Sequence, residues 1–191
     1  MGAWRPERTI LVKQIQALNR LECVHYTLGW VVDREQVPPS TLGPLLTKIF
    51  GEDWFKEKLL LVAHGEVVAG LDLSRLTEED FKIVGDEVHL RLPPSEILSS
   101  YLDNDRTYTF DYSKGLLTGG NAAVLNDMAR REAEHEMEKA AIKGGILERA
   151  RSNCRDNLRA LMLMAGYSAV TFEEVADEVP TPTPEVEATP E

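Results

Sequence analysis

The 191-residue chain has few cysteines and no long apolar run, and each scarcity excludes a class of protein. Its two cysteines, Cys23 and Cys154, lie far apart and outside any Cys-x-x-Cys or Cys/His ligand cluster. A disulfide-rich scaffold and a zinc site of the usual spacing are therefore excluded, whereas the redox compartment stays open. Apolar runs such as Leu59–Ala63 are far too short to cross a bilayer, which takes ~20 residues. As written, the sequence predicts a soluble protein.

Linear motifs for catalysis and for ligand binding are also absent. The four histidines are isolated from one another, and none belongs to an HxxxH or HExxH pair that would hold a metal. The glycine-rich segment 114–122 has neither the GxxxxGK[ST] nor the GxGxxG spacing of a phosphate-binding loop. The sequence therefore predicts no catalytic residue, no metal and no cofactor.

The acidic charge of the chain is concentrated at its C-terminal end. The formal net charge is −11, but residues 173–191 hold seven acidic residues and no basic one. The remaining residues carry 21 basic and 25 acidic side chains, so nucleic-acid binding, which needs a basic surface, is disfavoured. Proline recurs in the same terminal segment. We expect a polar segment at 1–20, a single domain at 21–172, and a disordered acidic tail at 173–191.

Alternation of apolar and polar residues predicts a sheet rich in hairpins. Residues 21–32 alternate with a period of two, and 59–63 and 67–71 form two further apolar runs. We expect His64-Gly65 to join these two runs in a tight turn, because glycine supplies the positive φ that such turns need. A second hairpin is expected around Gly85-Asp86. Additional strands are predicted at 97–102, 107–112 and 169–172.

The predicted turn also raises a catalytic alternative, because His64 is followed by Asp72 and Ser74. A nucleophile needs a base within reach, and that base needs an orienting partner. Only co-occurrence in the sequence supports such a triad, whereas Asp-x-Ser commonly caps a turn through side-chain-to-backbone hydrogen bonds. We therefore interpret these residues as structural.

A long helix is predicted at about 121–165, since this segment lacks proline and is rich in strong helix formers. Gly144-Gly145 is expected to bend it, and two helices meeting there remain an alternative. The predicted buried stripe has spacings of three and four and consists of Leu125, Ala129, Ala133, Met137, Ala140, Gly144, Leu147, Ala150, Cys154, Leu158, Leu161 and Ala165.

Three segments in this order resemble an uncharacterised bacterial family, the domain of unknown function 4230. They are "GEVVAGLDLS" at 65–74, "LPPSEIL" at 92–98, and the helical region around "GIL" at 145–147. The resemblance covers roughly residues 20–172. It implies that related proteins carry an N-terminal membrane-spanning helix ahead of this domain, and it implies no activity. That helix is absent from residues 1–20 here.

Two surfaces are candidates for contact with a partner protein or a membrane. The first is an apolar helical stripe with an aromatic extension. Packing in the protein core is the default interpretation, and a helix that lies on a membrane or partner surface is the alternative. The stripe comprises Leu45, Leu46, Ile49, Phe50, Trp54 and Phe55. The second is a basic ladder at Arg151, Arg155 and Arg159, which is either a solvated helix face or a docking site for acidic groups.

The sequence thus predicts an α+β fold: an antiparallel, hairpin-rich sheet followed by a long C-terminal helix. The leading hypothesis for its function is a non-enzymatic interaction or scaffold module, with an unknown protein partner or a membrane surface. The alternative is an enzyme or a small-ligand-binding domain whose site is not encoded in a linear motif.

Overall fold

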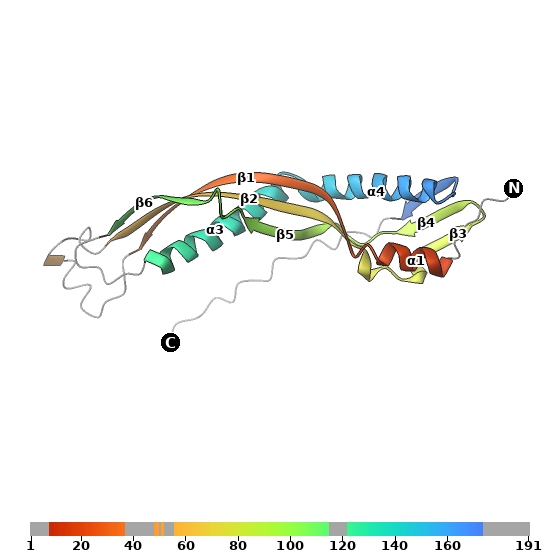
Figure 1. Ribbon diagram of the computed structural model, residues 1–191, viewed down its shortest axis with the longest axis horizontal. Helices are drawn as coiled ribbons and strands as arrows, with labels where there is room; N and C mark the ends of the chain where they lie inside the picture. The colour runs from red at the N-terminus through yellow and green to blue at the C-terminus, as the bar shows by residue number, and fades with distance from the viewer. Residues whose placement is uncertain (1–7, 37–47, 50, 52–55, 115–121, 174–191) are drawn as a thin grey trace.

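The structure is a computed structural model, and it is elongated, with two long strands running along most of its length (Figure 1). It describes residues 8–36, 48–49, 51, 56–114 and 122–173. The helices are α1 (Arg8–Gln16), α3 (Ala122–Lys143) and α4 (Ile146–Met164), with short 3₁₀ turns at Leu73–Arg75 and Glu78–Asp80. The strands are β1 (Arg20–Gln36), β2 (Glu57–Asp72), β3 (Phe81–Val84), β4 (Glu87–Arg91), β5 (Glu96–Leu102), β6 (Tyr108–Lys114) and β7 (Ala169–Glu173).

The strands form two sheets, and the predicted α+β class is confirmed. In the larger, four-stranded sheet, β2 pairs antiparallel with β1 along one edge. Along its other edge β2 pairs first with β6 and then with β5, so β1 forms one edge of the sheet. The smaller sheet contains the predicted hairpin of β3 and β4, whose turn has Gly85 at φ 60°, and β7 pairs parallel to β4.

The tight turn predicted at His64-Gly65 is wrong, because β2 continues through both residues. Every second residue of β2 from Glu57 to Leu71 is buried, with no break in the alternation at 64–65. The hairpin partner of β2 is β1, with register pairs that run from Arg20↔Asp72 to Gln36↔Glu57. The chain that joins these two strands is residues 37–56, most of which lie outside the described part.

Gly65 serves close packing and not a turn, since its φ is not positive. A Cβ atom added there would lie 2.6 Å from the carbonyl oxygen of Tyr101 on β5 and 3.0 Å from Met137 Cε on α3. The strand is therefore pressed between a neighbouring backbone and a helix at this residue. Glycine within a strand often marks such a close approach.

The predicted long helix is two helices, which was the alternative left open at Gly144-Gly145. Gly145 lies between α3 and α4 with φ 78°, a left-handed conformation that glycine adopts without strain. The break shifts the helical phase, so the predicted stripe is correct in part. Ala141, Ile146 and Met162 are buried in place of Ala140, Leu147 and Leu161, and Gly144 is exposed. The observed stripe is Leu125, Ala129, Ala133, Met137, Ala141, Ile146, Ala150, Cys154, Leu158 and Met162.

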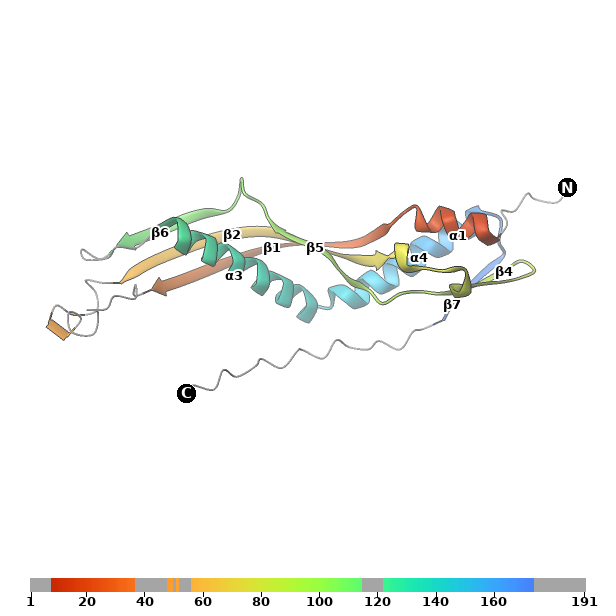
Figure 2. The same cartoon turned by 90° about the horizontal axis from the view of Figure 1, so that it is seen from below.

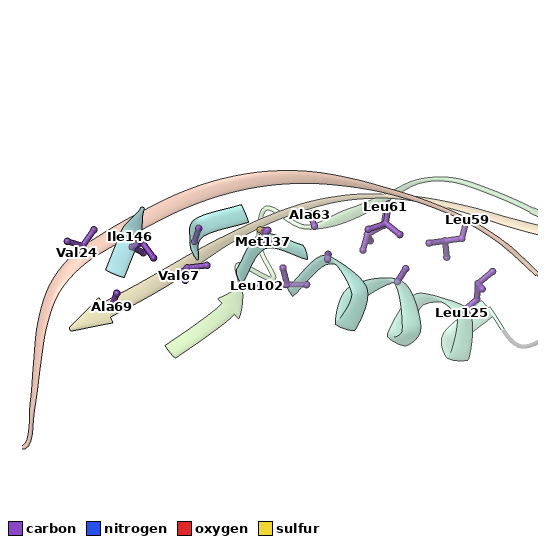
Figure 3. Packing of buried hydrophobic residues seen from close by; sticks show 14 of the residues in the cluster. Val24, Leu59, Leu61, Ala63, Val67, Ala69, Leu102, Leu125, Met137 and Ile146 are labelled. Carbon is purple, nitrogen blue, oxygen red and sulfur yellow. The ribbon is translucent and has the colours of Figure 1, made fainter. Parts of the chain in front are cut away.

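Two apolar cores lie along the molecule. The first fills the space between the larger sheet and the helices α3 and α4, where alternate residues of β2 meet the small residues of α3 (Figure 3). The second joins α1, the end of α4 and the smaller sheet around Phe81 and Leu158. Val12 and Ile15 of α1 are buried in it, within the segment for which the sequence suggested only polar character.

A β-bulge in β1 places Cys23 beside α4. Glu22 pairs with Gly70 and Val24 with the next residue, Ala69, so Cys23 is the extra residue of the bulge. A bulge re-aims a side chain, and Cys23 joins the core on the helical side instead of following the alternation of the strand. There it forms a disulfide with Cys154 of α4, which the sequence analysis did not predict.

Candidate functional site

The outer edge of β1 is the longest open strand edge in the described part of the chain. β1 has 17 residues and pairs along one side only, with β2. Its central stretch, VHYTLGWVV at 24–32, contains no Asp, Glu, Lys, Arg or Pro. Charged residues, proline and bulges are the usual means by which proteins block an exposed edge. The central part of this edge has none of them, because the bulge lies just before it, at Cys23.

Charged side chains are confined to the two ends of β1. At the C-terminal end, Arg34 forms an ion pair with Glu132 of α3. Glu35 Oε1 lies 3.0 Å from Lys56 Nζ, and Glu35 Oε2 lies 3.5 Å from Lys58 Nζ. The hydrogen bond from Lys56 lowers the pKa of the Glu35 carboxyl, so this group stays ionised. These contacts anchor the end of the strand to its own chain.

The face of β1 that points to the helices is only partly covered. Tyr26, Leu28 and Trp30 are half-buried at the margin of the first core. The hydroxyl of Tyr26 donates to the carbonyl oxygen of Gly144 at 3.4 Å, and the Arg149 guanidinium lies 5.9 Å from the centre of the tyrosine ring. Figure 2 shows that α3 and α4 cross the sheet obliquely. Their junction contacts β1 through the hydrogen bond between Tyr26 and Gly144.

The opposite face of the sheet carries an ordered polar cluster across three strands. Glu66 of β2 pairs in register with Thr27 of β1 and with Tyr101 of β5. Its carboxylate accepts a hydrogen bond from the Tyr101 hydroxyl and lies 2.6 Å from His25 Nδ1. The hydrogen bond from Tyr101, followed by the one from His25, lowers the pKa of the Glu66 carboxyl. The same carboxylate raises the pKa of the Tyr101 phenol.

A shallow depression of about 260 Å³ lies beside this cluster. Its lining residues are Thr27, His64, Gly65, Glu66, Tyr101, Asp103 and Arg106. General acid–base catalysis works best when the pKa of the catalytic group lies near the operating pH. The pKa of Glu66 and that of Tyr101 both move away from neutrality, so each group keeps one protonation state. The cluster can bind and orient a ligand, but these two groups are poorly suited to proton transfer.

His64, Asp72 and Ser74 do not form a triad. Asp72 Oδ1 accepts hydrogen bonds from the backbone N–H of Ser74 at 3.1 Å and from its hydroxyl at 2.5 Å. This is the predicted capping role, and Asp72 is the N-cap of the 3₁₀ turn at Leu73–Arg75. His64 lies in the middle of β2, where its backbone N–H and carbonyl both bind the Thr107 hydroxyl. The catalytic alternative thus gains no support from the geometry.

The residues predicted as partner contacts are described only in part. Ile49 lies in a helical segment and is exposed, whereas Leu45, Leu46, Phe50, Trp54 and Phe55 lie outside the described residues. In α4, Arg151 and Arg155 are half-buried, and Arg159 is exposed. Arg159 Nη1 lies 2.9 Å from Asp156 Oδ1, and Arg159 Cζ lies 5.4 Å from the ring centre of Phe172. Partner binding by either predicted surface therefore stays a prediction.

In the described part of the chain, no group of three or more His, Cys, Asp or Glu side chains is arranged to hold a metal ion. No helix among these residues has the length and apolar character that crossing a membrane requires.

Neither the edge of β1 nor the cluster around Glu66 was predicted from the sequence. The stretch Val24–Val32 was a usable signal for the edge, because it is long and contains no Asp, Glu, Lys, Arg or Pro. The cluster had no linear signal. His25, Glu66 and Tyr101 are far apart in the sequence and meet only through strand register.

Comparisons with known proteins identify a family but no characterised relative. A family model described as "Protein of unknown function (DUF4230)" matches residues 13–172. No curated protein and no solved structure matches the chain significantly. Among the described elements, the match includes α3, α4 and both sheets except the last residue of β7, and it begins within α1. The chain therefore belongs to the DUF4230 family of proteins of unknown function.

Proposed function

We propose that this domain is a non-enzymatic interaction module that binds its partner by adding a β-strand to the outer edge of β1. The observation that carries the proposal is the open edge itself, which contains no Asp, Glu, Lys, Arg or Pro from Val24 to Val32. An exposed strand edge presents a row of unpaired N–H and C=O groups, and peptide-binding domains use such edges to pair with a further strand. Backbone hydrogen bonds supply affinity in this mode, and alternate side chains supply specificity.

The surroundings of the edge also favour an added strand. A strand placed beside β1 would lie about 4.8 Å away in the plane of the sheet. The junction of α3 and α4 contacts β1 itself, through the hydrogen bond from Tyr26 to Gly144, so it lies close to the place of the added strand. Tyr26, Leu28 and Trp30 would lose their remaining exposure to water, which stabilises a complex through apolar burial.

The enzymatic alternative has less support. The depression beside Glu66 is shallow, and the two perturbed groups next to it keep fixed protonation states at neutral pH. The hydrogen bonds of Glu66 to Tyr101 and His25 order the open face of the sheet next to β1. This arrangement supports recognition of side chains on a bound strand.

The proposed setting is the oxidising side of a membrane. Disulfides persist mainly in secreted, periplasmic and extracellular proteins, and the Cys23–Cys154 bond supports such a compartment. The resemblance to proteins with a membrane-spanning helix ahead of this domain supports a position close to a membrane. A module in this position would act as a scaffold for other surface proteins.

Site-specific photo-crosslinking in cells that naturally produce the protein tests the proposal. A photoreactive amino acid is placed at Thr27 or at Val31, both exposed on β1, and at the control position Ser152, exposed on α4. We expect discrete adducts from the two β1 positions and none from Ser152. Absence of adducts at Thr27 and Val31, or equal adducts at all three positions, contradicts strand pairing at this edge.

A further inference from the structure

We infer that the partner strand is β1 of a second copy of this chain, an inference that rests on the proposed function. Two copies related by a two-fold axis would place their β1 edges antiparallel, joining two four-stranded sheets into one. The dimer would be closed, because each copy contributes the same edge once. The strands on the other side of each sheet, β5 and β6, have seven residues each and offer much shorter edges.

The sequence of β1 is complementary to itself in one register. Pairing centred on Gly29 places His25 opposite Asp33 of the second copy on the open face. Thr27 then lies opposite Val31 on the same face. Asp33 is exposed and has no ion pair with any residue in the described ranges. The symmetric contact would place Asp33 beside His25 of the second copy in each half of the interface. On its own chain, His25 already has Glu66 at 2.6 Å from Nδ1 and Glu22 at 3.7 Å from Nε2. Opposite partners across antiparallel strands stabilise pairing.

Neighbouring registers of the same symmetry are less favourable. Centring on Leu28 places Asp33 opposite Cys23, which is the bulged residue and is turned toward the helices. The register centred on Gly29 places Glu35 there instead, and the Glu35 carboxylate already binds Lys56 and Lys58 of its own chain. Centring on Trp30 places His25 opposite Glu35 and Asp33 opposite Thr27. The register centred on Gly29 pairs Asp33, which has no ion pair within the described residues, with a histidine, and glycine there leaves space at the two-fold axis.

The helices fit beneath the joined sheet. Tyr26, which binds the α3–α4 junction through Gly144, is three residues from Gly29, or about 10 Å along the strand. The two junctions would therefore lie on opposite sides of the two-fold axis, about 20 Å apart along the strand direction. A helix with its side chains is ~10–12 Å wide, so both junctions can lie on the same face of the joined sheet without collision. Each junction would cover the apolar residues Leu28 and Trp30 near the axis.

Sedimentation equilibrium of the full chain tests the inference. We expect a concentration-dependent dimer for the wild type. The double variant Thr27→Lys/Val31→Lys places two lysines opposite each other in each half of the interface and should raise the dimer dissociation constant at least tenfold. The control Val84→Lys changes an exposed apolar residue on β3, far from β1, and should leave the dimer intact. Far-UV circular dichroism verifies that all three chains are folded.

A second variant pair tests the register. Asp33→Lys removes the contact with His25 and should weaken the dimer, whereas Asp105→Lys, the same charge change in the exposed loop between β5 and β6, should not. Hydrogen exchange supplies an independent readout. In the dimer, the amides of residues 24–34 that point away from β2 should exchange more slowly as protein concentration rises, and the lysine double variant should lose this dependence.

The outcomes separate this inference from the proposed function. A dimer that persists in the lysine double variant, or slow exchange confined to residues outside β1, overturns self-pairing. A chain that remains monomeric at all concentrations also overturns it. If crosslinks from Thr27 and Val31 then identify a different protein, the edge of β1 is still the binding surface and only the identity of the partner is wrong. If those crosslinks are missing as well, both proposals fail.

Discussion

Cys23 and Cys154 are 131 positions apart in the sequence, yet their Cα atoms lie 5.5 Å apart and their side chains form a disulfide. The bond ties β1, at the start of the larger sheet, to the middle of α4, within the second apolar core. It closes a loop that contains most of the folded domain. A crosslink of this kind restricts the unfolded chain more than the folded one.

Removal of the disulfide should lower the stability of the domain without changing its fold. For the double variant Cys23→Ala/Cys154→Ala we expect a loss of roughly 2–4 kcal/mol in the free energy of unfolding. Urea denaturation with and without a reducing agent measures the effect. The reducing agent should destabilise the wild type and leave the double variant unchanged, and equal sensitivity of the two proteins would show that the bond does not form.

Gly65 should tolerate no side chain. Gly65→Val places atoms against the Tyr101 carbonyl and Met137, and overpacking of this kind typically costs ~1–3 kcal/mol. The adjacent change His64→Thr, on the open face of β2, should alter stability by no more than about 0.5 kcal/mol. Chemical denaturation compares the two variants. If Gly65→Val is as stable as the wild type, β2 and β5 are not in contact at this residue.

The helical phase after the Gly144-Gly145 break can be tested with neighbouring residues. Ile146 is fully buried, so Ile146→Ala should cost about 2–5 kcal/mol of unfolding free energy. Leu147 is only half-buried, and Leu147→Ala should cost about half as much or less. Thermal or urea unfolding shows which of the two variants loses more unfolding free energy. The reverse order would mean that α4 is rotated relative to its observed position.

The link between Glu66 and Tyr101 predicts a specific pH dependence. The pKa of Glu66 is lowered in the folded state, so its contribution to stability is present above the pKa of the unfolded chain and is lost as pH falls through the folded pKa. The contribution of Tyr101 to stability depends on pH in the opposite direction, because the pKa of its phenol is raised in the folded state. This contribution is present below the pKa of the unfolded chain and is lost as pH rises through the folded pKa.

Tyr101→Phe tests this pH dependence because it removes the hydroxyl and keeps the ring. We expect the pKa of Glu66, followed by carboxyl-carbon NMR, to rise toward its ordinary value in this variant. The stability difference between the variant and the wild type should vanish in acid, once Glu66 is protonated in both proteins. An unchanged Glu66 titration would show that the hydrogen bond does not form in solution.

The sequence by itself determined the α+β class, most strand positions and much of the buried helical stripe. These features depend on local pattern: alternation in β1, the glycine turn at Gly85, and spacings of three and four from Leu125 onward. The same local reasoning failed at Gly65. A glycine that opens a turn and one that admits a neighbouring backbone look identical in a single sequence, and only the position of β5 distinguishes them.

Tertiary structure alone decided the candidate site. Whether a strand lies at an edge depends on which strands pair with its neighbour, and β1 is an edge because β5 and β6 both pair along the far side of β2. The disulfide likewise required the bulge that turns Cys23 toward α4. His25, Glu66 and Tyr101 form one cluster because strand register aligns them. Pairing partners and register are set by long-range packing against the helices, which no short segment of the sequence encodes.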